Sequence, residues 1–210
     1  MTWTVDRTAS QHYADDTGRR YWSVSQVRNR MDPGAFDRVG KDVLAKASLR
    51  GQLVHGYAAL YLMYLDGLVQ VPEVPEGYEG YCQAVRLACD QLEPEVLDLE
   101  EIDGNLKMGI AGTKDFLAGV TWKGKRNRVA LCDWKTGAPT KTDPAQLMLY
   151  HTFPSNEHAE VLLDIYLRRD GTYTIVEVKK KDHAHDWAAA LNAIQALKID
   201  QQLTEWRKRK

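Results

Sequence analysis

The sequence predicts an α/β (α+β) fold in which a central mixed sheet is flanked by helices and preceded by a helical N-terminal part. Apolar residues recur every three or four positions in the first half of the chain, which is typical of helices. Residues 95–134 and 160–180 instead hold short β-type runs bounded by glycine-containing turns, which is typical of strands. Helices and strands arranged in this order favour one mixed sheet with helices packed against it.

Length and composition agree with this class. The chain has 210 residues, of which 44% are hydrophobic and 27% charged, and its formal net charge is −1. These values are typical of one folded domain with a substantial core, and they exclude a chain that is disordered by composition. A charge near zero provides no argument for a nucleic-acid-binding protein, although it does not exclude a local basic groove.

The compartment is predicted from apolar runs and cysteines. No run of about 18 apolar residues occurs, so we expect no membrane partner. The polar, acidic start MTWTVDRTASQHYADD is unlike a signal peptide. Cys82, Cys89 and Cys132 form no CxxC pair, which favours reduced, buried thiols over disulfides or a zinc site. We therefore expect a cytoplasmic protein.

The N-terminal part is predicted to be helical. Ser23 or Ser25 is suited to cap a short helix that ends before an Asp-Pro-Gly sequence. Helical spacing of apolar residues over 35–65 predicts one long or broken helix. A further helix is expected over about 78–92, because Pro94 stops it.

Strands follow these helices. We expect strands over 95–102, 106–122 and 128–134, joined by turns at 103–105 and 123–125.

The remaining elements are a helix, two strands and a last helix. The helix lies within 139–151, with Asp143 as its N-cap and Pro144 at its first position. The strands are expected over 160–169 and 172–180. The predicted organisation is a single domain, 1–210, composed of a helical part (1–93), a sheet with one helix (94–182), and a C-terminal helix with a basic tail (183–210).

Two carboxylates and a lysine are predicted to converge on this sheet. A turn centred on Gly124 places Asp115 opposite Asp133, and Lys135 shares a face with Asp133 because it is two positions away. Facing carboxylates repel each other, and a divalent cation removes that penalty. Oxygen ligands favour Mg²⁺ or Mn²⁺, and a nearby lysine suits metal-assisted phosphodiester hydrolysis. The alternative is a structural ion-pair cluster on an exposed strand.

Four motifs in this order resemble the RecB-like branch of the PD-(D/E)XK nuclease superfamily. They are GQLVH at 51–55, GTKD at 112–115, DWKTG at 133–137 and QLMLY at 146–150. The resemblance covers about residues 21–150 and implies a restriction-endonuclease-like core, so that the chain forms a single nuclease domain. The branch includes helicase-nuclease subunits and the phage and CRISPR-associated exonucleases.

The resemblance also implies roles for individual residues. The implied metal ligands are His55, Asp115, Asp133 and the backbone carbonyl of Trp134. The implied catalytic set is Asp115, Asp133, Lys135, Gln146 and Tyr150, with Gln146 and Tyr150 on one helix face. The alternatives are a core histidine at position 55 and a core tyrosine at position 150.

The implied activity is that of an Mg²⁺- or Mn²⁺-dependent deoxyribonuclease, favoured as an exonuclease of DNA replication, recombination or phage DNA metabolism. The alternatives are an endonuclease of the same fold and a non-catalytic DNA-binding or assembly subunit. The expected partner is DNA, either single-stranded or a duplex end. A second copy of the chain, in a homo-oligomer, or a recombination or replication protein is a further expected partner. We expect no iron–sulfur cluster, because the clusters of some relatives need four cysteines.

Basic residues near the motifs are the expected DNA contacts. They are Arg28, Arg30, Arg50 and Lys141.

Two other acidic sets are expected to lie outside the site. If the preceding hairpin turns at 103–104, Glu100 and Glu101 lie roughly 20 Å from Asp115, unless the strand is bulged. Asp164, Glu177 and Lys179 repeat the D…ExK form, but they lack the surrounding motifs.

Overall fold

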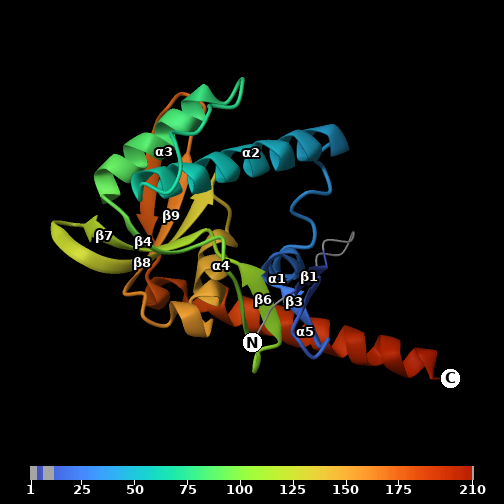
Figure 1. The fold of residues 1–210 in the computed structure, drawn as a ribbon. Helices are drawn as coiled ribbons and strands as arrows, with labels where there is room; N and C mark the ends of the chain where they lie inside the picture. Colours follow the sequence, from blue (N-terminus) through green and yellow to red (C-terminus); the bar gives the residue numbers. More distant parts are fainter. Residues whose placement is uncertain (1–3, 7–11, 210) are drawn as a thin grey trace.

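The computed structural model describes residues 4–6 and 12–209 and shows two five-stranded mixed sheets with helices around them (Figure 1). The predicted fold class is therefore confirmed. Among the described residues, no helix is long and apolar enough to cross a membrane.

The central sheet carries the strands of the Asp115 and Asp133 motifs. Its strand order is β10-β9-β8-β7-β4, and only the β8/β9 pair is parallel. The strands are β4 (Glu95–Leu99), β7 (Phe116–Trp122), β8 (Lys125–Lys135), β9 (Val161–Leu167) and β10 (Tyr173–Glu177).

The second sheet, in the order β1-β2-β3-β6-β5, was not predicted. Its strands are β1 (Thr4–Asp6), β2 (His12–Ala14), β3 (Arg20–Ser23), β5 (Ile102–Asn105) and β6 (Ile110–Thr113). The expected continuous strand over 106–122 is wrong, because the chain changes sheets between Thr113 and Phe116. The expected turn at 103–105 is instead part of β5, and β6 pairs in parallel with β3.

Within residues 12–209, five α-helices surround the sheets. They are α1 (Val24–Met31), α2 (Lys41–Leu65), α3 (Glu79–Leu92), α4 (Asp143–Tyr150) and α5 (Ala184–Lys208), with short 3₁₀ turns η1 (Pro154–Asn156) and η2 (Lys180–His183).

The helix ends mostly follow the sequence signals. Ser23 caps α1 in a capping box with Gln26, as one of the two predicted caps. The expected start of the long helix at position 35 was too early, because a turn precedes Lys41. The cap of α4 is Thr142 and not Asp143, which is the first residue of the helix.

The helices cover both faces of the central sheet. In Figure 1, α2 and α3 lie on one side of it, and α4 and α5 lie on the other. One core cluster joins α2 and α3 to Phe116, Cys132 and Trp134, whereas a second joins α1, α4 and α5 to Leu117 and Leu131. Alternate residues of β7 and β8 thus face opposite cores.

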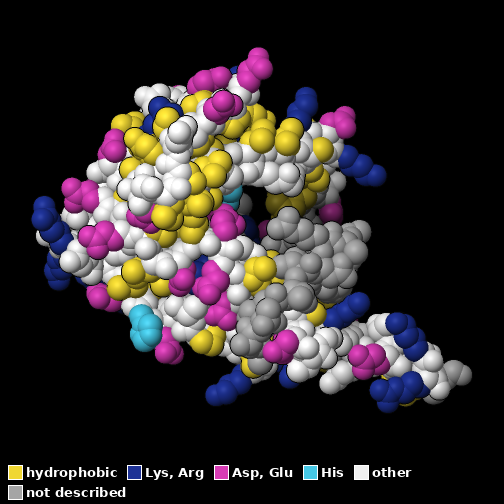
Figure 2. All heavy atoms as spheres, viewed as in Figure 1, with side chains coloured by type: hydrophobic (Ala, Val, Ile, Leu, Met, Phe, Trp, Pro, Cys, Tyr) yellow, Lys and Arg dark blue, Asp and Glu magenta, His cyan; other side chains and the backbone are white. Residues whose placement is uncertain are grey.

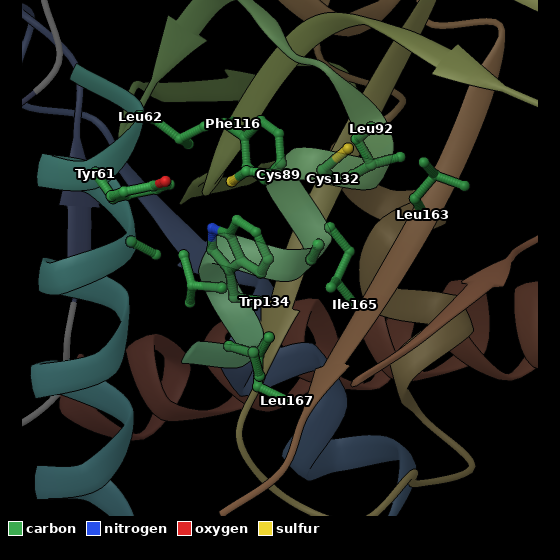
Figure 3. Packing of buried hydrophobic residues seen from close by; sticks show 14 of the residues in the cluster. Tyr61, Leu62, Cys89, Leu92, Phe116, Cys132, Trp134, Leu163, Ile165 and Leu167 are labelled. Carbon is green, nitrogen blue, oxygen red and sulfur yellow. The ribbon is translucent and has the colours of Figure 1, made fainter. Parts of the chain in front are cut away.

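The core beneath α3 holds aromatic rings and thiols. Phe116 and Trp134 stack with ring centroids 5.1 Å apart, and Figure 3 shows Cys89 and Cys132 in the same cluster. All three cysteines are free and buried, as predicted. Burial raises the pKa of Cys82 to about 11 and that of Cys89 to about 12, so these thiols are poor nucleophiles.

Candidate active site

The predicted β7/β8 register is confirmed, because Phe116 pairs with Cys132 and Leu117 with Leu131. Asp115 lies directly before β7, and its Oδ2 accepts a hydrogen bond of 2.6 Å from the backbone N–H of Trp134. The Asp115 carboxylate is therefore attached to the strand that carries Asp133. Both aspartates are buried.

His55 reaches this point from α2. Its Nδ1 lies 3.3 Å from Asp115 Oδ1, and its side chain is 30% exposed. A Cβ atom on Gly51, one turn earlier, would lie 4.0 Å from Thr136 Oγ1, so α2 passes close to the DWKTG segment. His55 accordingly lies against a carboxylate and not within the apolar core.

Glu100 is a site residue that the sequence reasoning placed too far away. Ligand atoms of His55, Glu100 and Asp115 all lie within 4.8 Å of one another. β4 pairs with β7 through a bulge, Leu99 opposes Phe116, and the N–H of Glu100 donates to the carbonyl of Asp115 over 2.9 Å. The estimate failed because the hairpin formed by β5 and β6 leaves the central sheet between these two strands. The sequence analysis allowed Glu100 near Asp115 only if the strand was bulged, and β4 does carry a bulge, between Val96 and Asp98.

Glu101 lies outside this group, as expected. Its carboxylate contacts the ammonium of Lys114, which also contacts Asp98 over 3.2 Å and Ser155 Oγ over 2.9 Å. The Lys114 side chain is fully buried, so these partners compensate the cost of burying its charge. A lysine at this point of the GTKD motif therefore packs away from Asp115.

Lys135 lies among several acidic side chains. Its ammonium contacts Asp133 Oδ2 closely and donates to Gln146 Oε1 over 2.7 Å. Asp164 Oδ1 and Asp143 Oδ1 lie at 3.8 and 4.0 Å. Asp133 is not among the three residues that gather at His55, because its carboxylate faces this lysine.

The motif helix α4 contributes Gln146 and Tyr150 differently. Gln146 contacts Asp133 Oδ1 through Nε2 at 3.3 Å, in addition to Lys135. Tyr150 is buried and packs edge-on against Phe153, and a Cβ atom on Gly112 would lie 2.6 Å from its ring. The motif glycine thus makes room for the tyrosine. The structure therefore brings Gln146 to Lys135, whereas the Tyr150 ring packs against Phe153 and Gly112.

Neighbouring charges set the protonation of the His55 group. Burial disfavours an imidazolium, but the carboxylates of Asp115, Asp133 and Glu100 together outweigh it and raise the pKa of His55 to about 9. Burial likewise opposes ionisation of Asp115, yet His55 and the Trp134 N–H hold its pKa below the ordinary value. Burial, with the charge of Asp115, raises the pKa of Glu100 to about 7. A cation that binds here therefore competes with protons.

The donor set of the His55 group fits a hard divalent cation. One imidazole and two carboxylates offer nitrogen and oxygen ligands of the kind that Mn²⁺ and Mg²⁺ accept. The carboxylate of Asp133 can join this set only if its contact with the Lys135 ammonium is broken. Whether the carbonyl of Trp134 also contributes stays a prediction.

The expected DNA-contacting residues do not all reach one surface. Arg28 donates to Asp143 Oδ1 over 2.7 Å and contacts Gln146, which places it beside the site. Lys141 pairs with Asp32 at 3.0 Å. Arg28 and Lys141 line one cavity of about 610 Å³. Its lining residues are Ser25, Arg28, Asn29, Asp32, Ala35, Phe36, Thr140, Lys141 and Thr142.

The other two arginines lie elsewhere. Arg30 pairs with Asp200 of α5 at 3.1 Å, which joins α1 to α5. Arg50 lies over the ring of Tyr81, 5.9 Å from its centroid, at the contact of α2 with α3.

The second D…ExK set is divided between two faces of the sheet. Glu177 opposes Leu163, whereas Asp164 opposes Val176, so the two carboxylates project in opposite directions. Glu177 accepts a hydrogen bond from Trp122 Nε1 over 3.0 Å. Asp164 instead opposes Asp133 across the parallel β8/β9 pair, and burial raises its pKa to about 7.

No protein-family model and no curated protein matches the sequence. Among solved structures, the chain is similar to an alkaline exonuclease, LHK-Exo, from Laribacter hongkongensis, with a TM-score of 0.47, 12% identity, and coverage of 90% of this chain and 93% of that one. For LHK-Exo in complex with dAMP the TM-score is 0.44 and the identity is 13%, with coverage of 90% of this chain and 93% of that one. For the crystal structure of SSO0001 the TM-score is 0.39 and the identity is 16%, with coverage of 83% of this chain and 75% of that one.

Proposed function

We propose that this protein is a metal-dependent DNA nuclease of the PD-(D/E)XK type, which hydrolyses phosphodiester bonds. The observation that carries the proposal is the convergence of His55, Glu100 and Asp115, with ligand atoms within 4.8 Å of one another, beside Asp133 and Lys135. These residues come from α2, from the end of β4, and from the start of β7 and the end of β8. Such a group of acids with a lysine suits phosphoryl chemistry.

The proposed ligands of Mg²⁺ or Mn²⁺ are His55, Glu100, Asp115 and Asp133, with the carbonyl of Trp134. When bound, the cation would polarise a phosphate oxygen and lower the pKa of a bound water. His55 has to lose its proton to bind the cation, and Asp115 already lacks one. The Trp134 N–H keeps the Asp115 carboxylate oriented through the 2.6 Å hydrogen bond.

Lys135 is the proposed catalytic cation. Its ammonium can orient the attacking water or stabilise the charge that develops on the phosphate. Gln146 accepts a hydrogen bond from that ammonium over 2.7 Å and also contacts Asp133, so it lies between the two groups. Tyr150, at the C-terminal end of α4, packs against Phe153.

The proposed substrate is DNA, as a single strand or a duplex end. The cavity that contains Arg28 and Lys141 provides two cationic side chains and several hydroxyl groups for the backbone phosphates next to the scissile one. We favour an exonuclease of replication, recombination or phage DNA metabolism. An endonuclease and a non-catalytic DNA-binding or assembly subunit are the alternatives.

The test of this function is the Asp133→Asn variant with and without metal. Wild-type protein should digest DNA in Mg²⁺ or Mn²⁺, stop in EDTA and resume when the metal is restored. The variant should lose at least about 10³-fold in rate, because a neutral amide replaces an acidic ligand.

The matched control is Asp170→Asn, in the exposed turn between β9 and β10, which should cleave like wild type. Circular dichroism should show the same helix content in both variants. Undiminished cleavage by Asp133→Asn, or cleavage that persists in EDTA, contradicts the proposal.

A further inference from the structure

Asp164 is a buried carboxylate without a hydrogen-bond donor. It lies in β9 and is 1% exposed, and neither of its carboxylate oxygens accepts a hydrogen bond from any described residue. A carboxylate in this condition is costly, because burial removes its hydration without replacing it. The proposed function assigns it no role.

Its position is determined by the parallel strands. Asp164 opposes Asp133, so both carboxylates lie on the sheet face that also carries Lys135. The ammonium of Lys135 lies 3.8 Å from Asp164 Oδ1, which is an ion-pair distance but longer than a hydrogen bond. Lys135 is thus shared between the two aspartates and is closer to Asp133.

Asp143, the third carboxylate near Lys135, is already satisfied. Its Oδ1 accepts from Arg28 over 2.7 Å, and its Oδ2 accepts from the Thr140 N–H over 2.8 Å and from the Tyr166 hydroxyl over 3.0 Å. Asp143 therefore has a counter-charge and several donors of its own. Asp164 has none of these and depends on Lys135.

We infer that Asp164 is a positioning residue that retains the Lys135 ammonium at the active site when Asp133 turns to a divalent cation. The inference rests on the proposed function, because that function makes Asp133 a ligand. Once Asp133 is engaged elsewhere, the lysine loses its closest partner, and Asp164 is the buried carboxylate with free oxygens beside it. Without Asp164, the Lys135 ammonium loses the buried counter-charge that would keep it next to the scissile phosphate.

The first test needs neither metal nor activity. Melting temperatures in EDTA are measured for wild type, Asp164→Asn, Lys135→Ala and the double variant. Removing the lysine leaves Asp164 buried without a counter-charge, so Asp164→Asn should raise the melting temperature in the Lys135→Ala background by at least about 3 °C more than in the wild-type background. Equal shifts in both backgrounds overturn the inference, because a residue that only fills space does not depend on the lysine.

The second test separates positioning from binding. Asp164→Asn should lower kcat about tenfold or more, while KM for DNA and the Mn²⁺ affinity measured by calorimetry stay within about twofold of wild type. In the Lys135→Ala background, Asp164→Asn should lower kcat no further. A lost equivalent of bound Mn²⁺ overturns the inference, since Asp164 would then be a ligand.

Glu177→Gln is the matched control, because it removes a carboxylate from the adjacent strand on the opposite sheet face. It should change neither the lysine-dependent shift nor kcat. If wild type shows no nuclease activity while the melting temperatures remain coupled, the proposed function has failed and the Asp164–Lys135 pairing stands. If activity depends on Asp133 but the coupling is absent, the inference fails by itself.

Discussion

At the scale of single residues, the two motif aspartates have the same side chain but different partners. Asp115 contacts His55 at 3.3 Å and the Trp134 N–H at 2.6 Å, and these partners keep its pKa low. Asp133 is buried beside Lys135, and burial together with Asp115 raises its pKa even though the lysine opposes the rise. In the proposed metal site, Asp115 would bind the cation as an ionised carboxylate, whereas Asp133 would first have to separate from Lys135.

The role of Lys135 is tested by Lys135→Ala. The variant should retain DNA and Mn²⁺ binding but lose about 10²–10⁴-fold in kcat, because the proposed role belongs to the hydrolytic step. Single-turnover cleavage and a DNA-binding titration measure the two effects separately. Lys179→Ala, at an exposed lysine, is the control. If DNA affinity falls as much as the rate, Lys135 is a binding residue.

The pairing of His55 with Asp115 predicts a pH-dependent stability. The pKa of His55 is raised from 6.5 to about 9, so the folded state binds this proton more tightly than the unfolded state. The stabilisation is thus complete below pH 6.5 and is lost as the pH rises through about 9. In EDTA, His55→Gln should melt below wild type at about pH 6 and close to it at about pH 10. A difference that does not change with pH contradicts this pairing.

At the scale of elements, strand alternation decides which acidic residues can act together. Asp133 and Lys135 share one face of β8, Asp164 joins them from β9, and α4 covers that face with Gln146. Glu177 lies on the other face of β10 next to Trp122. A D…ExK pattern in sequence is therefore insufficient, because its members also have to face the same side.

The two patterns are separated by paired substitutions. Glu177→Gln and Lys179→Ala should leave cleavage within about threefold of wild type, whereas Asp133→Asn and Lys135→Ala should cost several orders of magnitude. Initial rates on one labelled DNA substrate provide the comparison. A protein that cleaves normally without Lys135 but not without Lys179 would show that the active site does not lie at β8, as proposed, but next to β10.

At the scale of the whole molecule, the site lies where both sheets and α2 meet. Figure 2 shows acidic and basic side chains interspersed over the visible face, and an opening between the segments in its centre. Helix α5 extends away from the body in Figure 1. Arg28 and Lys141 line one cavity, and each pairs with an aspartate, Arg28 with Asp143 and Lys141 with Asp32.

The exonuclease proposal predicts a dependence on DNA ends. In Mg²⁺, linear DNA should be degraded to short products, and covalently closed circles of the same sequence should persist. Gel electrophoresis of both substrates over time makes the comparison, with Asp133→Asn as the inactive control. Linearisation of the circles favours the endonuclease alternative.

The sequence by itself predicted most of the helices and brought most of the candidate site residues into one proposed group. Spacing and turn residues predicted most of the helices, the β7/β8 register and the strands β9 and β10, because such signals act over a few residues. The motifs predicted His55, Asp115, Asp133, Lys135 and Gln146 as one group, and the structure brings them into adjoining contacts.

Only the tertiary structure decided which distant segments meet. The second sheet depends on pairing β3 with β6, and Glu100 reaches Asp115 only because the intervening hairpin leaves the central sheet. Asp164 reaches Lys135 across a parallel pair, which joins segments separated by a helix. Strand order and crossover connections arise from long-range packing, and no short pattern encodes them. The ligands and partners that such contacts add therefore became visible only in the folded chain.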